Sequence, residues 1–225
     1  MGEFGSKEAI EGKTSGESVL DKLQWRYAVK VYDKARKVSE SDLAVLEEAV
    51  LLAPSSFGIQ PYKVFVIINP ELREKLMPAA YNQPAVTDAS HLFVFAFKKT
   101  LTDTDMDDFL DRIAEVREQT RESLADLETA VKGAAQRAVE GGFVETWNSR
   151  QAYVALGILI ETAALLDIDA TPMEGFDPAK MNEVLGLTDY SAVALAAVGY
   201  RDAANDWLAV LPKVRKPKHE LIERM

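Results

Sequence analysis

The feature that most constrains the fold is a long, largely apolar segment over residues 143–167. Its apolar side chains recur at helical spacing on two adjoining faces, formed by Tyr153, Leu156, Leu159, Ile160, Ala163, Ala164 and Leu166. A helix that is apolar around most of its circumference must be covered on several sides by other elements. We therefore expect this segment to be the central helix of the molecule.

Three apolar runs predict short buried strands, at residues 62–68, 92–97 and 192–200. Further helices are expected at residues 18–25, 70–77 and 178–186, and in a segment that ends near Ala53. Ser39, Asn69 and Asp177 stand where the last three of these helices need N-caps.

The charged residues 103–139 predict one helix or two, broken by Gly141 and Gly142, and residues 171–176 predict a loop. The pattern favours one α+β domain. Because three strands make a thin sheet, a further strand is expected from elsewhere.

Composition excludes several classes of function. The chain has 225 residues, a net charge of −10 and no basic run, which argues against partners such as nucleic acid or an anionic membrane. It has no cysteine, so disulfides, thiol nucleophiles and thiolate metal sites are excluded. We expect no metal site, because the only histidines, His91 and His219, have no suggestive neighbours. No apolar run reaches the ~18–20 residues of a membrane span and no signal peptide is visible, so a cytoplasmic location is expected.

Residues 53–67 join a polar, constrained loop to an apolar strand. Pro54 and Pro61 restrict the backbone, and two serines, a glycine and a glutamine stand between them. Such a loop is either a plain connector or one wall of a site for a polar ligand. The residues of the loop alone leave both interpretations open.

A phosphate would have to be bound by side chains in this chain. Neither a G-x-G-x-x-G motif after a strand nor a P-loop is present. Arg26, Lys213 and Arg215 are isolated basic residues beside apolar segments, and arginine suits bidentate contacts with phosphate. The alternative for each of them is a surface ion pair. Glu174 and Gly175 form a short loop whose glycine would allow a close backbone approach to a ligand, or a simple turn.

Six segments match one family in order: RYAVKVYD, APSSFGIQPYKVFVI, TDASHLFVF, ETWNSRQAYVALG, PMEGFD and LPKVR. With them the chain resembles the FMN-dependent, oxygen-insensitive nitroreductases, in the branch that includes dihydropteridine reductase-like and flavin reductase-like enzymes. The resemblance implies a nitroreductase-like fold, with a central mixed β-sheet flanked by helices. It also implies a homodimer whose subunits exchange a strand through the C-terminal tail at residues 219–225. Residues 17–225 would form one FMN-binding domain, after a disordered or cloning-derived segment at residues 1–16.

The resemblance also implies a set of cofactor-binding residues. Those matching the phosphate and pyrimidine side of FMN are Arg26, Tyr27, Ala28, Lys30, Lys213 and Arg215. Those matching the dimethylbenzene side, donated by the partner subunit, are Pro54, Ser55, Ser56 and Gly58. Asn82 matches the polar rim of the flavin, and Gln151 and Tyr153 match positions beneath the cofactor. Glu174 and Gly175 match the loop that places a backbone N–H near flavin N5.

The implied function is an FMN-dependent NAD(P)H oxidoreductase that reduces nitroaromatics, quinones or similar small-molecule acceptors by ping-pong two-electron hydride transfer. No catalytic side chain is expected, because the chemistry belongs to the cofactor. The alternatives are a dihydropteridine or flavin reductase, a non-catalytic flavin-binding protein, and a cofactor-free helical interaction module.

The chain departs from the family pattern at Ala28, Gly58 and Ala85, where serine, asparagine and lysine are common. The missing lysine predicts a lower flavin potential. Residues 130–138 lack the usual aromatic side chains, which predicts an open substrate cleft.

Overall fold

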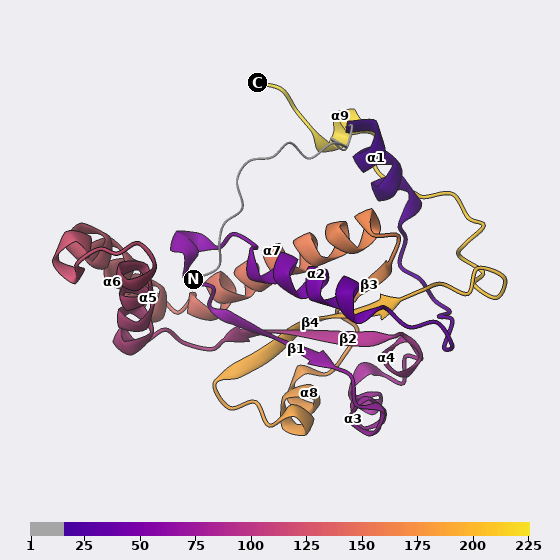
Figure 1. Cartoon of the computed structure of the whole chain (residues 1–225), viewed down its shortest axis with the longest axis horizontal. Helices are drawn as coiled ribbons and strands as arrows, with labels where there is room; N and C mark the ends of the chain where they lie inside the picture. The colour runs from indigo at the N-terminus through magenta and orange to yellow at the C-terminus, as the bar shows by residue number, and fades with distance from the viewer. Residues whose placement is uncertain (1–15) are drawn as a thin grey trace.

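A four-stranded sheet forms the centre of the molecule (Figure 1). The computed structural model describes residues 16–225. The strands are β1 (Tyr62–Ile67), β2 (His91–Lys98), β3 (Asp169–Met173) and β4 (Tyr190–Gly199), arranged in the order β1-β2-β4-β3. All three pairings are antiparallel.

Helices cover both faces of the sheet (Figure 1). One face carries α2 (Glu40–Leu51) and α7 (Val144–Leu165), and the other carries α3 (Pro70–Leu76), α4 (Ala85–Asp88) and α8 (Pro178–Leu185). Strand β2 sends Phe93 and Phe95 into the core under α7, and Leu92 and Val94 into the opposite core. Because both faces of β2 are covered, none of its side chains faces solvent and polar residues do not alternate with apolar ones. This explains its uninterrupted apolar run.

The predicted central helix is confirmed as α7. It contacts β1, β2, β3 and β4 and also packs against α1 (Gly16–Trp25), α2 and α6. The predicted N-caps of three other helices are confirmed as well. The side chains of Ser39, Asn69 and Asp177 each accept a hydrogen bond from a backbone N–H in the first turn of α2, α3 and α8.

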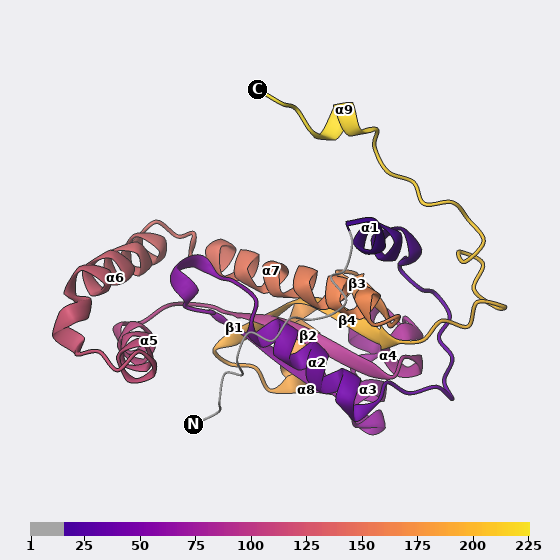
Figure 2. The same ribbon diagram turned by 45° about the horizontal axis from the view of Figure 1, so that its top comes forward.

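The charged middle of the chain forms two helices that stand apart from the sheet (Figures 1 and 2). They are α5 (Asp103–Val116) and α6 (Ala125–Glu140), joined by the short helix η3 (Arg121–Leu124). Their apolar faces enclose a small core that includes Met106, Val131 and Ala135. Arg121 and Lys132 pair with carboxylates on both helices, so part of the charge holds the helices together.

The structure corrects two details of the expected sheet. The prediction of a loop at residues 171–176 is wrong for 171–173, because β3 covers them and supplies the fourth strand from this same chain. Pro172 is tolerated there because β3 is an edge strand. The expected sheet was mixed, but the three strand pairings within this chain are all antiparallel.

The short elements are η1 (Ser56–Gly58), η2 (Pro78–Ala80) and α9 (Lys218–Leu221). After β4 the chain runs outside the sheet and its covering helices (Figures 1 and 2). Several apolar side chains of this tail are exposed, among them Trp207, Val214, Leu221 and Ile222. The exchange of the tail between subunits stays a prediction, and so does the single domain over residues 17–225. The segment expected at residues 1–16 lies outside the described residues, apart from Gly16.

Candidate functional site

Basic side chains from the two ends of the chain meet in one cavity. Arg26 follows α1, while Lys213 and Arg215 belong to the C-terminal tail, and all three line a cavity of about 740 Å³. Tyr27 and Ala28 line the same cavity. The structure therefore brings together five of the residues predicted for the phosphate and pyrimidine side of a cofactor.

Arg26 has an incomplete set of hydrogen bonds within the described residues. Its Nε atom is buried and has no hydrogen-bond partner there. Burial lowers the pKa of its guanidinium, and the nearby charge of Arg215 lowers it further. A buried N–H donor without a partner, next to another cation, is stabilised by an anionic acceptor.

Lys213 ties the tail to the end of α1. Its Nζ donates to the backbone carbonyl of Leu23 at 2.5 Å and to that of Arg26. Burial lowers the pKa of Lys213, and the charges of Arg26 and Arg215 add to this effect. Arg215 is exposed, and its Nη1 donates to the carbonyl of Val214 at 2.7 Å.

Arg201, which follows β4 and lines this cavity, forms an ion pair with Asp169 at the start of β3. Nε of Arg201 lies 3.0 Å from both carboxylate oxygens of Asp169, and its Nη2 lies 2.5 Å from Oδ1. The guanidinium of Arg201 also stacks over Trp25 and Tyr27, at 4.1 and 4.4 Å from the ring centres. Sequence reasoning missed both partners, because nothing local distinguishes Arg201 or Asp169 from other charged residues.

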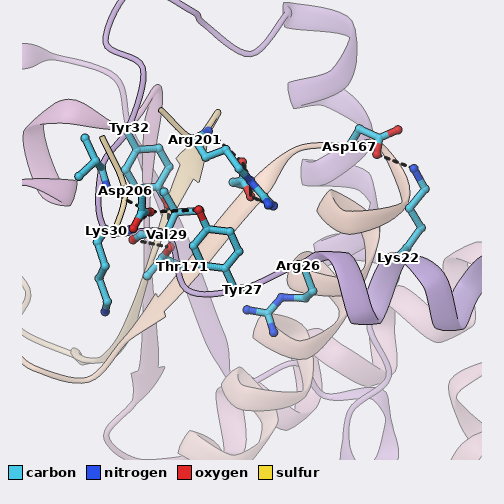
Figure 3. A network of polar contacts seen from close by, with 12 residues as sticks. Lys22, Arg26, Tyr27, Val29, Lys30, Tyr32, Asp167, Thr171, Arg201 and Asp206 are labelled. Carbon is cyan, nitrogen blue, oxygen red and sulfur yellow. Dashed lines mark hydrogen bonds and ion pairs between the residues drawn. The ribbon is translucent and has the colours of Figure 1, made fainter. Parts of the chain in front are cut away.

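Asp206 lies beside this ion pair (Figure 3). Its carboxylate accepts hydrogen bonds from the hydroxyl of Tyr27 and the backbone N–H of Lys30. The side chain of Lys30 itself is exposed. Asp206 was not predicted from the sequence either.

The loop at residues 54–60 stands apart from this cavity. Its backbone N–H at Ser56 donates to Oε1 of Gln151 on α7, and Ser55 Oγ accepts from the N–H of Gln60. Pro54 is exposed, and Gly58 has a φ of +86°. The N–H of Gly58 donates to the carbonyl of Ser55, which closes the turn.

The two predicted parts of the site lie toward opposite ends of α7. Gln151 contacts the loop, whereas Lys22 of α1 pairs with Asp167 just beyond the other end of the helix. Leu165 follows Gln151 by fourteen positions, which is about 20 Å along the helix at ~1.5 Å per residue. A single chain therefore does not bring Ser55 and Ser56 to Arg26.

A third group lies where β3 ends. The hydroxyl of Tyr153 donates to Oε1 of Glu174 at 2.6 Å, and Nε2 of Gln83 donates to the carbonyl of Gly175 at 2.6 Å. Burial and the Glu174 carboxylate raise the pKa of Tyr153 to about 12. Asn82 is exposed beside Gln83, with a φ of +56°. Gln83 was missed because an isolated glutamine in a polar loop gives no signal in the sequence.

Comparison with known proteins identifies the family. The model of the Nitroreductase family matches residues 23–200. This chain belongs to the nitroreductase family. The matched range spans the predicted positions from Arg26 to Gly175 and ends before Lys213 and Arg215.

One curated relative and two solved structures match most of this chain, and the structures share its fold. The major NAD(P)H-flavin oxidoreductase of Aliivibrio fischeri is 35% identical over 211 residues, covering 91% of this chain and 97% of the relative. A solved nitroreductase-like protein from Streptococcus mutans has a TM-score of 0.79 at 20% identity, over 93% of this chain and 98% of that one. A protein from Exiguobacterium sibiricum, assigned as a nitroreductase and solved in complex with FMN, has a TM-score of 0.76 at 22% identity, over 92% and 97% of the two chains.

The structure locates each residue at which this chain departs from the nitroreductase pattern. Ala28 lines the cavity of Arg26, and Gly58 has a positive φ of +86°, in a region where asparagine is also tolerated. Ala85 is 8% exposed and belongs to the core, so its Cβ contributes to packing. On α6, Ala135 and Ala138 are buried in the core shared with α5. The lower potential and the open cleft stay predictions.

The described part of the chain offers neither a metal-binding cluster nor a membrane-spanning helix. Residues 16–225 contain no cluster of three or more histidines or carboxylates that could hold a metal ion. Over the same residues, no helix is long and apolar enough to cross a bilayer.

Proposed function

We propose that this chain is an FMN-dependent NAD(P)H oxidoreductase that reduces nitroaromatics, quinones or similar electron-poor acceptors. The observation that carries the proposal is the cluster of Arg26, Lys213 and Arg215 around one cavity, in a chain of the nitroreductase family. The names of two relatives agree with it, since one is an NAD(P)H-flavin oxidoreductase and another was solved with FMN.

The residues around the cavity suit the phosphate of FMN. Arg26 presents a buried N–H without a partner in the described residues, and Arg215 adds an exposed guanidinium. Arginine binds phosphate through paired N–H donors. Burial lowers the pKa of Arg26 and Lys213 and repulsion between the cations lowers it further, and a bound dianion would offset that repulsion. We assign the phosphate to this cluster, with Tyr27 and Ala28 beside it.

When bound, FMN would supply the two-electron transfer between NAD(P)H and the acceptor. The chain's own residues would position the cofactor. We propose that the segment of Glu174 and Gly175 contacts the flavin ring, with Asn82 at its rim. Tyr153 and Gln83 hold this segment from two sides, at 2.6 Å each. Because the pKa of Tyr153 is raised to about 12, its hydroxyl stays a donor to Glu174 across the physiological pH range.

We further propose that the enzyme is a homodimer with FMN sites at the interface. Exposed apolar side chains lie on or next to α2 and α7, namely Val45, Leu51, Leu52, Val154 and Leu165. Such residues suit a surface buried in an assembly. A second copy related by two-fold symmetry could bring its Ser55 and Ser56 to the cavity of Arg26, which one chain does not achieve.

The C-terminal tail fits this assembly. The edge strand β1 and α2 border a groove of about 440 Å³, whose apolar lining includes Leu51, Ile59 and Val64. The tail carries exposed Leu221 and Ile222. We assign the tail of the second copy to this groove, where it would add a strand beside β1. For the enzyme as a whole we propose a cytoplasmic location, where NAD(P)H is available.

A flavin reductase is the second candidate. The relative from Aliivibrio fischeri is named for flavin as its acceptor, and it matches 91% of this chain. A dihydropteridine reductase of the same fold and a non-catalytic flavin-binding protein are the other outcomes that the experiment below distinguishes.

An anaerobic spectral titration tests the proposed function. The purified protein is loaded with FMN, titrated with NADH and with NADPH, and then mixed with a nitroaromatic, a quinone, free flavin or a pteridine. We expect a reduced nicotinamide to bleach the visible flavin band, and a nitroaromatic or quinone to restore it. A band that neither nicotinamide bleaches would indicate a non-catalytic flavin-binding protein. Restoration by free flavin or the pteridine alone would indicate the corresponding reductase.

A further inference from the structure

We infer that Asp206 is a positioning residue for cofactor binding, which joins the two chain segments carrying the phosphate-binding cations. The inference rests on the proposed function, because it takes the cavity of Arg26, Lys213 and Arg215 as the FMN phosphate site. Asp206 itself does not line that cavity and has no predicted contact with the cofactor.

The Asp206 carboxylate is buried and fully engaged. It is 3% exposed, and its Oδ2 accepts from the backbone N–H of Lys30 at 2.8 Å, from that of Val31 at 3.3 Å and from the hydroxyl of Tyr27 at 3.1 Å. Its Oδ1 accepts from the N–H of Leu208 at 2.9 Å. Burial alone would raise its pKa, but these hydrogen bonds lower the pKa below its ordinary value. The group is therefore a carboxylate over the whole neutral range.

These contacts connect two segments that are far apart in the sequence (Figure 3). Tyr27, Lys30 and Val31 follow Arg26 directly, while Leu208 belongs to the tail that leads to Lys213 and Arg215. Few other backbone contacts join the segments nearby. Asp202 N–H donates to the carbonyl of Val31 at 2.9 Å and Asp33 N–H donates to that of Tyr200 at 2.8 Å, and these two bonds flank the isolated bridge between Tyr32 and Arg201.

The junction needs such a link because the cations on its two sides repel each other. Burial has the largest effect in lowering the pKa of Arg26, the charge of Arg215 lowers it further and Asp169 opposes this with a smaller effect, and Arg26 likewise lowers the pKa of Lys213 after the larger effect of burial. Lys213 holds the tail at one point, through the carbonyls of Leu23 and Arg26. Without a second tie, the rest of the tail would move away from Arg26 in the cofactor-free chain. Asp206 opposes that movement with bonds to both segments, so the cluster is preorganised for an anion.

The prediction is specific to the phosphate, and riboflavin, which lacks it, provides the comparison. In Asp206→Asn an amide NH₂ replaces one carboxylate oxygen. At least one of the groups that donate to Asp206 would then face this NH₂, which is itself a donor. Binding of FMN and of riboflavin to the cofactor-free protein is measured by quenching of flavin fluorescence. We expect the Kd for FMN to rise at least about tenfold and the Kd for riboflavin to stay within about twofold.

Asp202→Asn is the matched control. Asp202 lies in the same turn, but among the described residues its side chain bonds only to Asn205 of the tail, so both flavin affinities should be unchanged. Tyr27→Phe provides a second test should Asp206→Asn fail to fold, since it removes one of the four bonds and should lower FMN affinity alone, by a smaller factor.

Several outcomes would overturn the inference. The inference is wrong if Asp206→Asn keeps the wild-type preference for FMN over riboflavin. If that variant does not fold, the same result in Tyr27→Phe would overturn it. Equal loss of both flavins in a folded variant would assign Asp206 a general structural role instead. A wild-type protein that binds FMN no better than riboflavin would refute the phosphate site itself, and that failure is visible before any variant is made.

Discussion

At the scale of single residues, Arg26 is the clearest case of a side chain placed for binding rather than for stability. It is partly buried, its Nε has no partner in the described residues, and the charge of Arg215 acts on it more strongly than that of Asp169. Its pKa is lowered in the folded chain, so the charged form is less favourable there than in the unfolded chain. Removing the charge should therefore not destabilise the cofactor-free fold.

We predict that Arg26→Met separates FMN binding from stability. The Tm of the cofactor-free variant should equal or exceed that of the wild type, while FMN affinity should fall by about 1.5–3 kcal/mol, the value of a charge-assisted hydrogen bond. Thermal unfolding and fluorescence titration measure the two quantities. Arg117→Met, just beyond the end of α5, makes the same change away from the cavity and should leave FMN affinity unaltered. A large drop in Tm with unchanged affinity would contradict this account.

The sequence predicts one half of this site better than the other. Arg26, Lys213 and Arg215 stand out because they are basic residues beside apolar segments in an acidic chain, and the structure places them around one cavity. Asp206 and Asp169 could not be found in this way. The chain has 36 acidic residues, and these two differ from the rest only through distant partners, which lie 176 positions away for Asp206 and Lys30 and 32 positions away for Asp169 and Arg201.

At the scale of elements, the loop at residues 54–60 combines a fixed shape with an exposed position. Phe57, Gly58 and Gln60 all have positive φ angles, and Gln151 holds the backbone at Ser56. A Cβ at Gly58 would meet only the Phe109 ring, 3.8 Å away. Any cost of substitution at Gly58 would therefore come from the backbone conformation and not from a clash.

This leads to a comparison of two substitutions at Gly58. Gly58→Ala should lower the free energy of unfolding by about 1–2 kcal/mol, because a residue with a Cβ is strained at a φ of +86°. Gly58→Asn should cost less, since asparagine adopts positive φ more readily. Denaturant unfolding at equal protein concentration compares the two variants. An alanine variant as stable as the wild type would mean that the loop can change its conformation freely.

Most elements follow from local patterns, and the exceptions have physical causes. The apolar periodicity located α7 and strands β1, β2 and β4, and the caps located the starts of α2, α3 and α8. Strand β3 was missed because it is short, contains Pro172 and has partners only on one side. Its strand character comes from pairing with β4, which no local sequence pattern reveals.

At the scale of the whole molecule, the site is divided between the two ends of α7. The cations gather near its C-terminal end, and the loop with Ser55 and Ser56 lies about 20 Å away along the helix. One chain cannot close a flavin site from these parts, whereas two copies could form two sites. The central claim is therefore that each FMN lies between two chains.

Subunit mixing tests this claim most directly. Arg215→Ala removes a cation on one side of the proposed site, and Ser56→Trp blocks the other side with a bulky ring. Each variant alone should bind FMN poorly. When the two are unfolded together and refolded as a mixture, random pairing should give intact sites equal to about one quarter of the total, because half of the dimers are mixed and each has one intact site. The measurement is FMN bound per chain in the mixture. We predict recovery to about that level, and a mixture that binds no more FMN than the separate variants would place the whole site within one chain.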